Sequence, residues 1–370
     1  MSLHIVQLAN FYTETSGGLR TAVDTLRAGY VDAGHRATLI IPGADDGVTG
    51  GEHGTVVTVA APVIPGSGGY RMITRMSAVR ELLEEFQPDR VEISDKATLL
   101  DAARWARPRG IPSVLFSHER LDAMLAYRLP RFLPSRGALR RYNKWIANQV
   151  DVIVGASSYA LREFTSLGVA NVELIPLGVD LETFRPPDVR RADDGRLRLV
   201  YAGRMSSEKR PDLLVAAADR LARRGVDFQL NMVGDGPLLR DLEKEAAGLP
   251  VAFLGHMSDR SALSGVLGQA DIALLPSPAE TFGLAALEAM ACGTPVIVSR
   301  GRGAAGLIST DSGLGVRPSG LAIADGIQEI AAIPRVIRES AARRRAELFN
   351  WQRTIDSMLG LHEGVREMVA

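Results

Sequence analysis

The sequence is almost without cysteine, since Cys292 is the only one among 370 residues. A single cysteine cannot form an intrachain disulfide, and its scarcity fits a reducing compartment. Cys292 stands between Ala291 and Gly293 at an expected helix end. That setting predicts a small buried side chain and not a nucleophile.

The sequence also lacks an excess of charge of either sign. Lys plus Arg and Asp plus Glu both number 43, so the formal net charge is zero. Generic nucleic-acid binding requires a basic field, and the chain as a whole carries none. We therefore expect no nucleic-acid partner, and any anionic partner has to meet a local basic patch.

Long apolar segments and metal-binding motifs are missing as well. No run approaches the length needed to span a bilayer, and residues 1–11 lack the features of a signal peptide. We therefore expect a cytoplasmic protein, with peripheral contact to the inner face of the cell membrane left open. The sequence has no Asp-x-Asp and no His, Cys and carboxylate cluster with metal-ligand spacing, which predicts that no metal is required.

A strand–helix–strand pattern occurs twice along the chain. Such openings build parallel sheets, and a chain of this length is expected to hold two domains. The first opening consists of residues 4–8, a loop with Ser16-Gly17-Gly18, residues 19–33 and residues 37–41; the second consists of residues 197–201, 203–209, 212–224 and 228–233. Further buried strands are expected at 89–93, 113–116, 151–154, 172–175, 251–254, 271–275 and 295–298.

The boundary between the two domains is expected in residues 179–196. This stretch is rich in charge and contains Pro186-Pro187, which is typical of an exposed connection. We therefore predict an N-terminal α/β domain over residues 1–180 and a C-terminal one over residues 181–350.

Polar residues follow several of these strands. Ligands of open α/β sheets bind outside the carboxyl ends of the strands, so these residues are candidates for a site. They are Gly17, Gly18, His118, Arg204, Lys209, Gly234, His256, Met257 and Glu280. If the two sheets face each other, all of them line one cleft.

Two loops carry groups that suit a phosphate. Gly17 and Gly18 precede a helix, where bare backbone N–H groups can receive an anion, although a glycine pair after a strand is equally consistent with a tight turn. Arg204 and Lys209 place two cations in one strand–helix loop, which suits a diphosphate. The alternative for the second loop is a solvated turn with ordinary surface cations.

The segment from Glu280 to Glu288 carries the strongest local signal. Helical spacing would put both carboxylates on nearly the same side, and the N–H groups of Phe282, Gly283 and Leu284 could hold an anion or a sugar hydroxyl. A carboxylate can accept two hydrogen bonds from a vicinal diol. Glu288 could instead be a solvated helical residue, but its neighbours are apolar, and a buried carboxylate needs a partner.

Residues 128–148 combine cations with large apolar side chains and contain no acidic residue. Arg140, Arg141 and Lys144 lie in this stretch. One interpretation is a surface for an anionic membrane or a lipid phosphate. The other is a helix that packs through its apolar side and leaves a solvated basic face.

Together these motifs resemble the retaining GT-B glycosyltransferases whose hallmark is the E-x7-E motif. The resemblance spans essentially the whole chain and includes Gly17-Gly18, His118, 175–180, Arg204 with Lys209, Gly234-Asp235-Gly236, Glu280 with Glu288, 293–296 and Trp351. It implies an α/β fold of two facing Rossmann-like domains with parallel sheets and a cleft between them. It also implies that a last helix, about 351–370, completes the N-terminal domain.

The resemblance implies a role for each matching residue. Arg204 and Lys209 would hold the donor diphosphate, and Glu288 the ribose. Glu280 and the backbone of residues 282–284 would bind the donor sugar. The remaining assignments place Met257 near the base, Gly234 beside the donor, Gly17 and Gly18 at the phosphates and acceptor, Arg20 on the acceptor side, and His118 beside the anomeric carbon.

Residues 16–24, 117–122, 280–290 and 341–353 resemble more closely the phosphatidylinositol-mannoside mannosyltransferases of actinobacteria. That resemblance implies GDP-mannose as donor, a glycolipid acceptor and a metal-independent transfer with retention. A transferase that uses a UDP-sugar or another donor on a soluble small-molecule acceptor remains an alternative. So does a sugar-nucleotide-binding module without catalysis.

Overall fold

The computed structural model describes residues 2–13, 17–65, 67, 69–121, 136–189, 191–192 and 194–369. These residues form two compact units. The first runs to residue 176 and takes in the helix that begins at Trp351, while the second comprises residues 177–350. The chain thus enters its second unit after residue 176, against the predicted 180.

The first unit is built on an eight-stranded sheet. Its strands are β1 (His4–Leu8), β2 (Arg36–Gly43), β3 (Gly47–Gly51), β4 (Gly54–Ala60), β5 (Arg90–Ile93), β6 (Ser113–Phe116), β7 (Val152–Gly155) and β8 (Val172–Leu174), in the order β3-β4-β2-β1-β5-β6-β7-β8. All neighbours are parallel except β3, which pairs with β4 in a hairpin. The sequence did not predict this hairpin, because β3 is fully exposed and glycine-rich and carries no apolar alternation.

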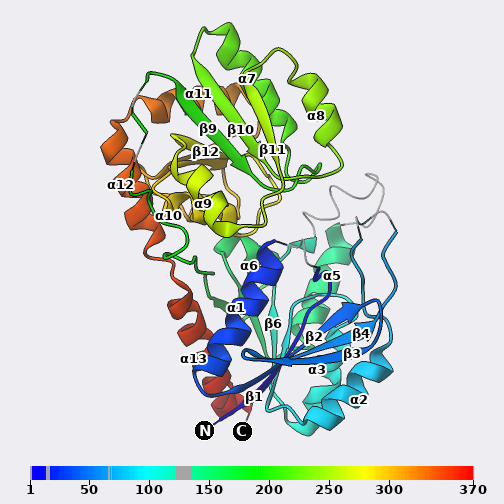
Figure 1. The fold of residues 1–370 in the computed structure, drawn as a ribbon. Coiled ribbons are helices and arrows are strands. Elements are labelled where there is room, and N and C mark those ends of the chain that lie inside the picture. Colours follow the sequence, from blue (N-terminus) through cyan, green and yellow to red (C-terminus); the bar gives the residue numbers. More distant parts are fainter. Residues whose placement is uncertain are drawn as a thin grey trace. The chain divides into compact units, whose positions relative to one another are not determined.

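Helices cover both faces of this sheet. On one face lie α1 (Gly18–Asp32) and α13 (Trp351–Val369), which Figure 1 shows side by side in blue and red. On the other lie α2 (Met76–Phe86), α3 (Leu100–Ala106), α5 (Arg136–Ala147) and α6 (Ser158–Thr165), which enclose the main apolar cluster with β1, β5 and β7. This is the layered packing expected of a parallel sheet.

A buried polar cluster fastens α13 to this sheet. Glu92 on β5 accepts hydrogen bonds from the Tyr30 hydroxyl at 2.8 Å and from Gln7 Nε2 at 2.9 Å, and it lies 3.2 Å from His362 Nε2 on α13. Burial opposes ionisation of Glu92, but the bond from His362 and those from Gln7 and Tyr30 hold its pKa below the usual value. Residues far apart in sequence thus place the last helix in the first unit.

The second unit has a six-stranded parallel sheet. Its strands are β9 (Leu197–Ala202), β10 (Phe228–Val233), β11 (Val251–Gly255), β12 (Ile272–Leu275), β13 (Val296–Ser299) and β14 (Gly313–Val316), in the order β11-β10-β9-β12-β13-β14. One face is covered by α7 (Asp212–Arg223), α8 (Leu239–Glu245) and α11 (Gly320–Ala331), and the other by α9 (Arg260–Gly268), α10 (Leu284–Ala291) and α12 (Arg335–Ala346). The glycine-rich β14 was not predicted.

The prediction that residues 179–196 form an exposed connection is wrong in part. Val179 and Phe184 are buried, at 3% and 0% exposure. The Val179 N–H donates to Phe349 O at 3.0 Å, and Arg343 donates to Phe184 O at 3.0 Å. The apolar residues of this segment pack into the second unit despite their charged neighbours, because burying them removes their surface from water.

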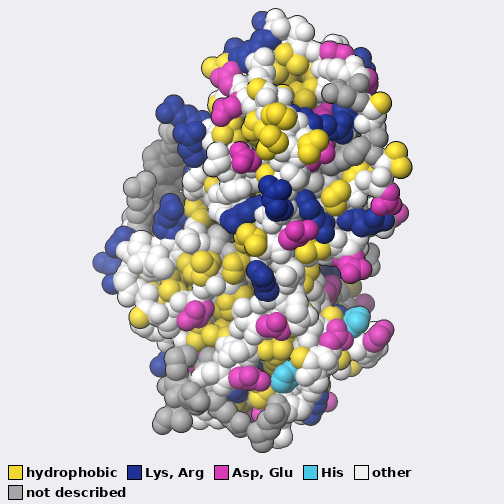
Figure 2. Space-filling model, turned by 90° about the vertical axis from the view of Figure 1, so that its left-hand side faces the viewer, with side chains coloured by type: hydrophobic (Ala, Val, Ile, Leu, Met, Phe, Trp, Pro, Cys, Tyr) yellow, Lys and Arg dark blue, Asp and Glu magenta, His cyan; other side chains and the backbone are white. Residues whose placement is uncertain are grey.

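The cysteine, the surface charges and the lengths of the apolar helices can be compared with what the composition predicted. Cys292 is fully buried, as predicted, and lies 3.4 Å from the Ser264 hydroxyl. On the face drawn in Figure 2, Lys and Arg side chains are interspersed with Asp and Glu. Among the described residues, no helix is long and apolar enough to cross a bilayer.

Candidate functional site

The order of strands in the second unit reverses between β9 and β12, which lie next to each other although β10 and β11 come between them in sequence. Loops that leave such neighbouring strands in opposite directions open a crevice at the carboxyl edge of the sheet. Lys209 stands on the loop after β9 and Glu280 on the loop after β12. Lys209 Nζ lies 2.6 Å from Glu280 Oε2, so the structure brings these two predicted residues together across the crevice.

Arg204 stands on the same loop as Lys209 and is half-buried. Its carbonyl oxygen accepts a hydrogen bond from the Tyr201 hydroxyl at 2.8 Å. Burial raises the pKa of Tyr201, with added contributions from Glu280 and Glu208, so this hydroxyl stays protonated and able to donate. The backbone that carries both cations is therefore fixed to β9.

Gly234, which was assigned to donor binding, has a packing role of its own. Its φ is +131°, and a Cβ there would come within 2.0 Å of the Gly203 carbonyl oxygen. The loops after β9 and β10 approach each other closely at this point, and Met205 N donates to Asp235 O at 2.8 Å. Packing alone accounts for glycine at this position.

The start of α10 presents unused hydrogen-bond donors. Gly283 caps the helix with φ +104°, and a Cβ there would lie 2.7 Å from Ala304 Cβ. Within the described part of the chain, the N–H groups of Phe282, Gly283 and Leu284 have no acceptor. Donors at a helix N-terminus favour an anion or a ligand oxygen. This arrangement agrees with the expectation for these three residues.

The two glutamates are held by different cations. Glu280 lies in the loop before α10, which begins at Leu284, so the two glutamates stand on different elements. Glu288 lies within α10, with its side chain 15% exposed, and its Oε1 accepts from Arg260 Nη2 at 3.1 Å. Burial raises the pKa of Glu288 to about 7, while Arg260 opposes the shift.

Arg260 was not predicted from the sequence. It is the first residue of α9, directly after the helix cap Asp259, and its guanidinium lies 4.8 Å from the ring centroid of Phe184. A lone arginine at a helix start gives no sequence signal, because most such residues are solvated. Met257 lies half-buried in the loop between β11 and α9, and His256 beside it is exposed.

In the first unit, His118 follows β6 and is half-buried, with its ring against Phe116. The two rings are stacked, with centroids 4.4 Å apart. Burial lowers the pKa of His118 to about 4, so the imidazole is neutral at physiological pH. A neutral imidazole can orient a sugar through a hydrogen bond but cannot serve as a cation at pH 7.

A buried ion pair that sequence reasoning missed anchors the residues after His118. Lys96 Nζ contacts both Glu163 and the carbonyl oxygen of Glu119. Glu163 Oε2 accepts from Leu121 N and from Asn143 Nδ2, both at 3.2 Å. The signal in the sequence was weak, since Lys96 shortly follows β5 but its partner on α6 is remote in the chain.

Gly17 and Gly18 form the start of α1, Gly17 as its cap and Gly18 as its first residue. Among the described residues, a Cβ at Gly17 would meet no atom within 4 Å, so packing against them does not require glycine there. Arg20 has a side chain that is 41% exposed and lies 3.5 Å from Asp24. Ser16, the first residue of the predicted loop, lies outside the described residues.

The basic stretch at 128–148 is described only from residue 136 onward. There it forms α5, on which Arg140, Arg141 and Lys144 are exposed while Asn143 and Ile146 are buried. Beside the cations, the rings of Tyr142 and Trp145 stack with centroids 5.3 Å apart and are 37% and 36% exposed. The helix therefore packs through one side and presents cations and aromatic rings on the other.

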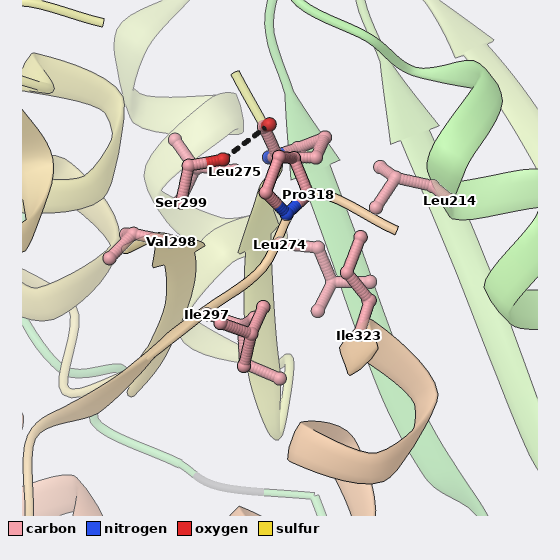
Figure 3. A pocket seen from close by; sticks show the side chains of 10 residues that line it. Leu214, Leu274, Leu275, Ile297, Val298, Ser299, Pro318 and Ile323 are labelled. Atoms are coloured by element: carbon pink, nitrogen blue, oxygen red, sulfur yellow. Dashed lines mark hydrogen bonds between the residues drawn. The ribbon is translucent and has the colours of Figure 1, made fainter. Parts of the chain in front are cut away.

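Neither an apolar hollow in the second unit nor a metal centre offers a further site among the described residues. The hollow drawn in Figure 3 lies among apolar side chains of α7, β12, β13 and α11 and has no room for a water molecule; Ser299 there donates to Pro276 O at 2.6 Å. It is a small packing gap between core side chains and not a ligand site. Among the described residues, no group of three His, Cys, Asp or Glu side chains could hold a metal ion.

Comparisons with known proteins match both units. The family model of a glycosyl transferase 4-like domain covers residues 17–178, and that of glycosyl transferases group 1 covers residues 196–332. A protein of Mycobacterium tuberculosis named GDP-mannose-dependent alpha-(1-6)-phosphatidylinositol dimannoside mannosyltransferase is 44% identical over 364 residues, which is 96% of this chain and 95% of the relative. The chain belongs to the group 1 glycosyltransferases.

Solved structures identify the fold of this glycosyltransferase. Sucrose-phosphate synthase from Thermosynechococcus elongatus superimposes with a TM-score of 0.82 at 23% identity, over 98% of this chain and 99% of that one. HepE of Anabaena, solved in complex with UDP and glucose, gives 0.75 at 18% identity, over 97% and 99%. The predicted GT-B class, with two parallel-sheet α/β domains, is confirmed.

Within each unit of the glycosyltransferase, the predicted residues gather at the carboxyl edge of the sheet. In the second unit these are Arg204, Lys209, Glu280, residues 282–284 and Glu288, with Arg260 as an addition. In the first unit Gly17 follows β1 and His118 follows β6. In the second unit, cations and backbone N–H groups can bind an anion. The carboxylates beside them can accept hydrogen bonds from hydroxyl groups.

Proposed function

We propose that this glycosyltransferase moves an α-mannosyl group from GDP-mannose to a phosphatidylinositol mannoside, with retention at the anomeric carbon. The observation that carries the proposal is the 44% identity to the M. tuberculosis mannosyltransferase, because it extends over nearly the full length of both chains. Similarity confined to one unit would support only the reaction class, whereas this similarity extends over both units.

The donor is assigned to the crevice between β9 and β12. Arg204 and Lys209 offset the diphosphate charge as the bond to the sugar breaks. Glu280 and the free N–H groups of residues 282–284 take sugar hydroxyls, and Glu288 takes the ribose diol. The pairing of Lys209 with Glu280 at 2.6 Å supports this assignment, since it holds the cation at the crevice before the donor arrives.

The reaction step needs no protein nucleophile. The acceptor hydroxyl oxygen forms a bond to the anomeric carbon on the face from which the diphosphate oxygen departs. The hydroxyl proton passes to the released phosphate oxygen, and the products are the glycoside and GDP. His118 orients the sugar as a neutral hydrogen-bonding group, and Gly17, Gly18 and Arg20 border the phosphates and the acceptor.

We further propose that the transfer proceeds without a metal ion and at a membrane surface. The two cations on the loop after β9 supply the charge that a divalent ion would provide. The exposed cations and aromatic rings of α5 suit anionic lipid headgroups and the interfacial region. An acceptor that is a glycolipid requires contact of this kind.

Nucleotide binding tests the donor assignment. Thermal shift and calorimetry would compare GDP, UDP, ADP, GDP-mannose and UDP-glucose in buffer with EDTA. We expect selective binding of GDP and GDP-mannose, followed by transfer of labelled mannose to phosphatidylinositol dimannoside. A preference for UDP or ADP would leave the reaction class intact but remove the GDP-mannose assignment. Failure to bind any nucleotide would favour the module without catalysis.

The acceptor assignment has its own test. Labelled mannose from GDP-mannose would be offered to phosphatidylinositol dimannoside in vesicles and to a water-soluble glycoside. Efficient transfer to the soluble compound alone would contradict the glycolipid assignment. Loss of transfer when EDTA is added, restored by Mg²⁺, would contradict the metal-independent step.

A further inference from the structure

Arg260, with its side chain 44% exposed, contacts both an aromatic ring and the carboxylate assigned to the ribose. Its guanidinium lies 4.8 Å from the centroid of Phe184 and donates through Nη2 to Glu288 Oε1 at 3.1 Å. Phe184 is fully buried, and its carbonyl oxygen accepts from Arg343 at 3.0 Å. The ring that Arg260 contacts is therefore held in place by its own packing.

Only one oxygen of Glu288 is used in this arrangement. Oε1 accepts from Arg260, while Oε2 has no hydrogen-bond partner among the described residues. A carboxylate has capacity for several hydrogen bonds, so Oε2 can receive a hydroxyl while Arg260 keeps Oε1 in place. A protonated carboxyl group would lose part of this capacity, because one oxygen would become a donor.

The charges around Glu288 determine how readily it ionises. Burial raises its pKa to about 7, Arg260 on α9 opposes that shift, and Asp180 adds to it. The strands β12 and β13 that pack against α10 carry no charged side chain. From α12, Arg343 approaches α10 but donates to the Ala291 carbonyl at 2.8 Å. Among the described residues, Arg260 is therefore the cation that pairs with this carboxylate.

We propose that Arg260 is a positioning residue for the donor, which holds Oε1 of Glu288 by a charge-assisted hydrogen bond and directs the other oxygen toward the nucleotide ribose. This inference rests on the proposed role of Glu288 as the ribose ligand. Arg260 acts through the carboxylate and does not itself contact the reacting carbon. Without Arg260, Glu288 would take up a proton at a higher pH. Its Oε1 would also lose the hydrogen bond that holds the carboxylate in place.

The test compares ribose recognition in Arg260 variants as a function of pH. Calorimetric dissociation constants would be measured for GDP and for 2′,3′-dideoxy-GDP between pH 6 and 9. The ratio of the two reports the contribution of the diol, because titration of the phosphates is common to both nucleotides. The variants are Arg260→Ala and Arg260→Lys, and the matched control is Arg223→Ala, an exposed arginine paired with Asp219 on α7.

For the unaltered chain, the preference for GDP over the dideoxy analogue should grow as the pH rises through the region near 7. In Arg260→Ala this preference should fall about tenfold at pH 7 and should partly return by pH 9, since one charge-assisted hydrogen bond sets its size. Arg260→Lys should retain most of the preference because it keeps the cation. Arg223→Ala should behave as the unaltered chain.

Three results would overturn the inference. The first is an Arg260→Ala protein with the full preference at pH 7, and the second is equal loss at every pH, which would indicate only a structural role. The third concerns the double variant Arg260→Ala with Glu288→Gln. If its loss of preference, as a free energy, equals the sum of the losses in the two single variants, the inference is wrong, because Arg260 should have no further effect once residue 288 cannot ionise. If the unaltered chain shows no preference for GDP over the dideoxy analogue, Glu288 does not bind the diol, and that part of the proposed function is wrong together with the inference.

A preference of the unaltered chain for UDP or ADP would remove only the GDP assignment. The same comparison would then be made with that nucleotide and its dideoxy form. The outcome for Arg260 is interpreted in the same way. Failure of the GDP assignment can therefore be told apart from failure of the inference about Arg260.

Discussion

The Nζ atom of Lys209 lies 2.6 Å from Oε2 of Glu280, across the point where the strand order of the second sheet reverses. Both side chains are partly exposed, at 33% and 22%. Ion pairs of this kind contribute only about 0–1 kcal/mol to stability. This pair can therefore be altered with little effect on folding.

Replacement of Lys209 should separate activity from stability. Lys209→Ala is expected to lower kcat for mannosyl transfer by roughly 10²-fold, because a cation aimed at the leaving diphosphate is lost. The free energy of unfolding should change by less than about 1 kcal/mol. Lys244→Ala, which removes an exposed lysine 3.5 Å from Asp241, is the matched control. Normal transfer by the Lys209 variant would show that this lysine does not act on the donor.

Gly17 offers a test of close approach by the ligand. The methyl group of Gly17→Ala would meet no atom of the described part of the chain within 4 Å, so urea unfolding should be unchanged. The added Cβ should hinder approach of the donor to the start of α1 and lower kcat/KM about tenfold. Gly50→Ala on the exposed strand β3 also meets nothing within 4 Å and serves as control. Equal kinetics for the two variants would mean that Gly17 is only part of a turn.

The half-buried His118 should make the protein sensitive to acid. Burial lowers the pKa of the folded-state imidazole from the usual 6.5 to about 4, so the unfolded chain takes up the proton first. Stability from this group is present above pH 6.5 and is lost as the pH falls toward 4; the loss between pH 7 and 5 is about 2 kcal/mol.

His118→Gln should remove this part of the pH dependence, measured by urea unfolding at pH 7 and pH 5. His256→Gln, at an exposed position, is the control and should leave the dependence as it was. If the His118 variant loses as much stability between these pH values as the unaltered chain, the imidazole is not kept neutral by burial.

The exposed cations of α5 should govern binding to anionic membranes. Arg140→Glu with Arg141→Glu is expected to abolish cosedimentation with phosphatidylglycerol vesicles, since each basic residue near such a surface contributes about 1 kcal/mol. Arg220→Glu with Arg223→Glu makes the same change in charge on α7. Unchanged sedimentation of the α5 variant would refute membrane contact through this helix.

Local patterns determined the fold class and most of the elements. The apolar run at residues 4–8 and the amphipathic stretch that follows form β1 and α1 close to the predicted bounds, and residues 113–116 and 228–233 form β6 and β10. Strand period, helix period and glycine loops are properties of neighbouring residues, so a sequence reveals them directly. The same patterns indicated which polar residues end up at the carboxyl edges.

What only the tertiary structure decided is which of these residues meet. Glu280 pairs with Lys209, and Glu288 with Arg260, through contacts between residues far apart in the chain. Buried pairs such as Lys96 with Glu163 and His362 with Glu92 follow no local rule. The sequence by itself determined two parallel-sheet domains and their ligand-binding edges. The partners were set by the order of the strands, because a parallel sheet brings together segments whose separation in sequence is unrelated to their distance in space.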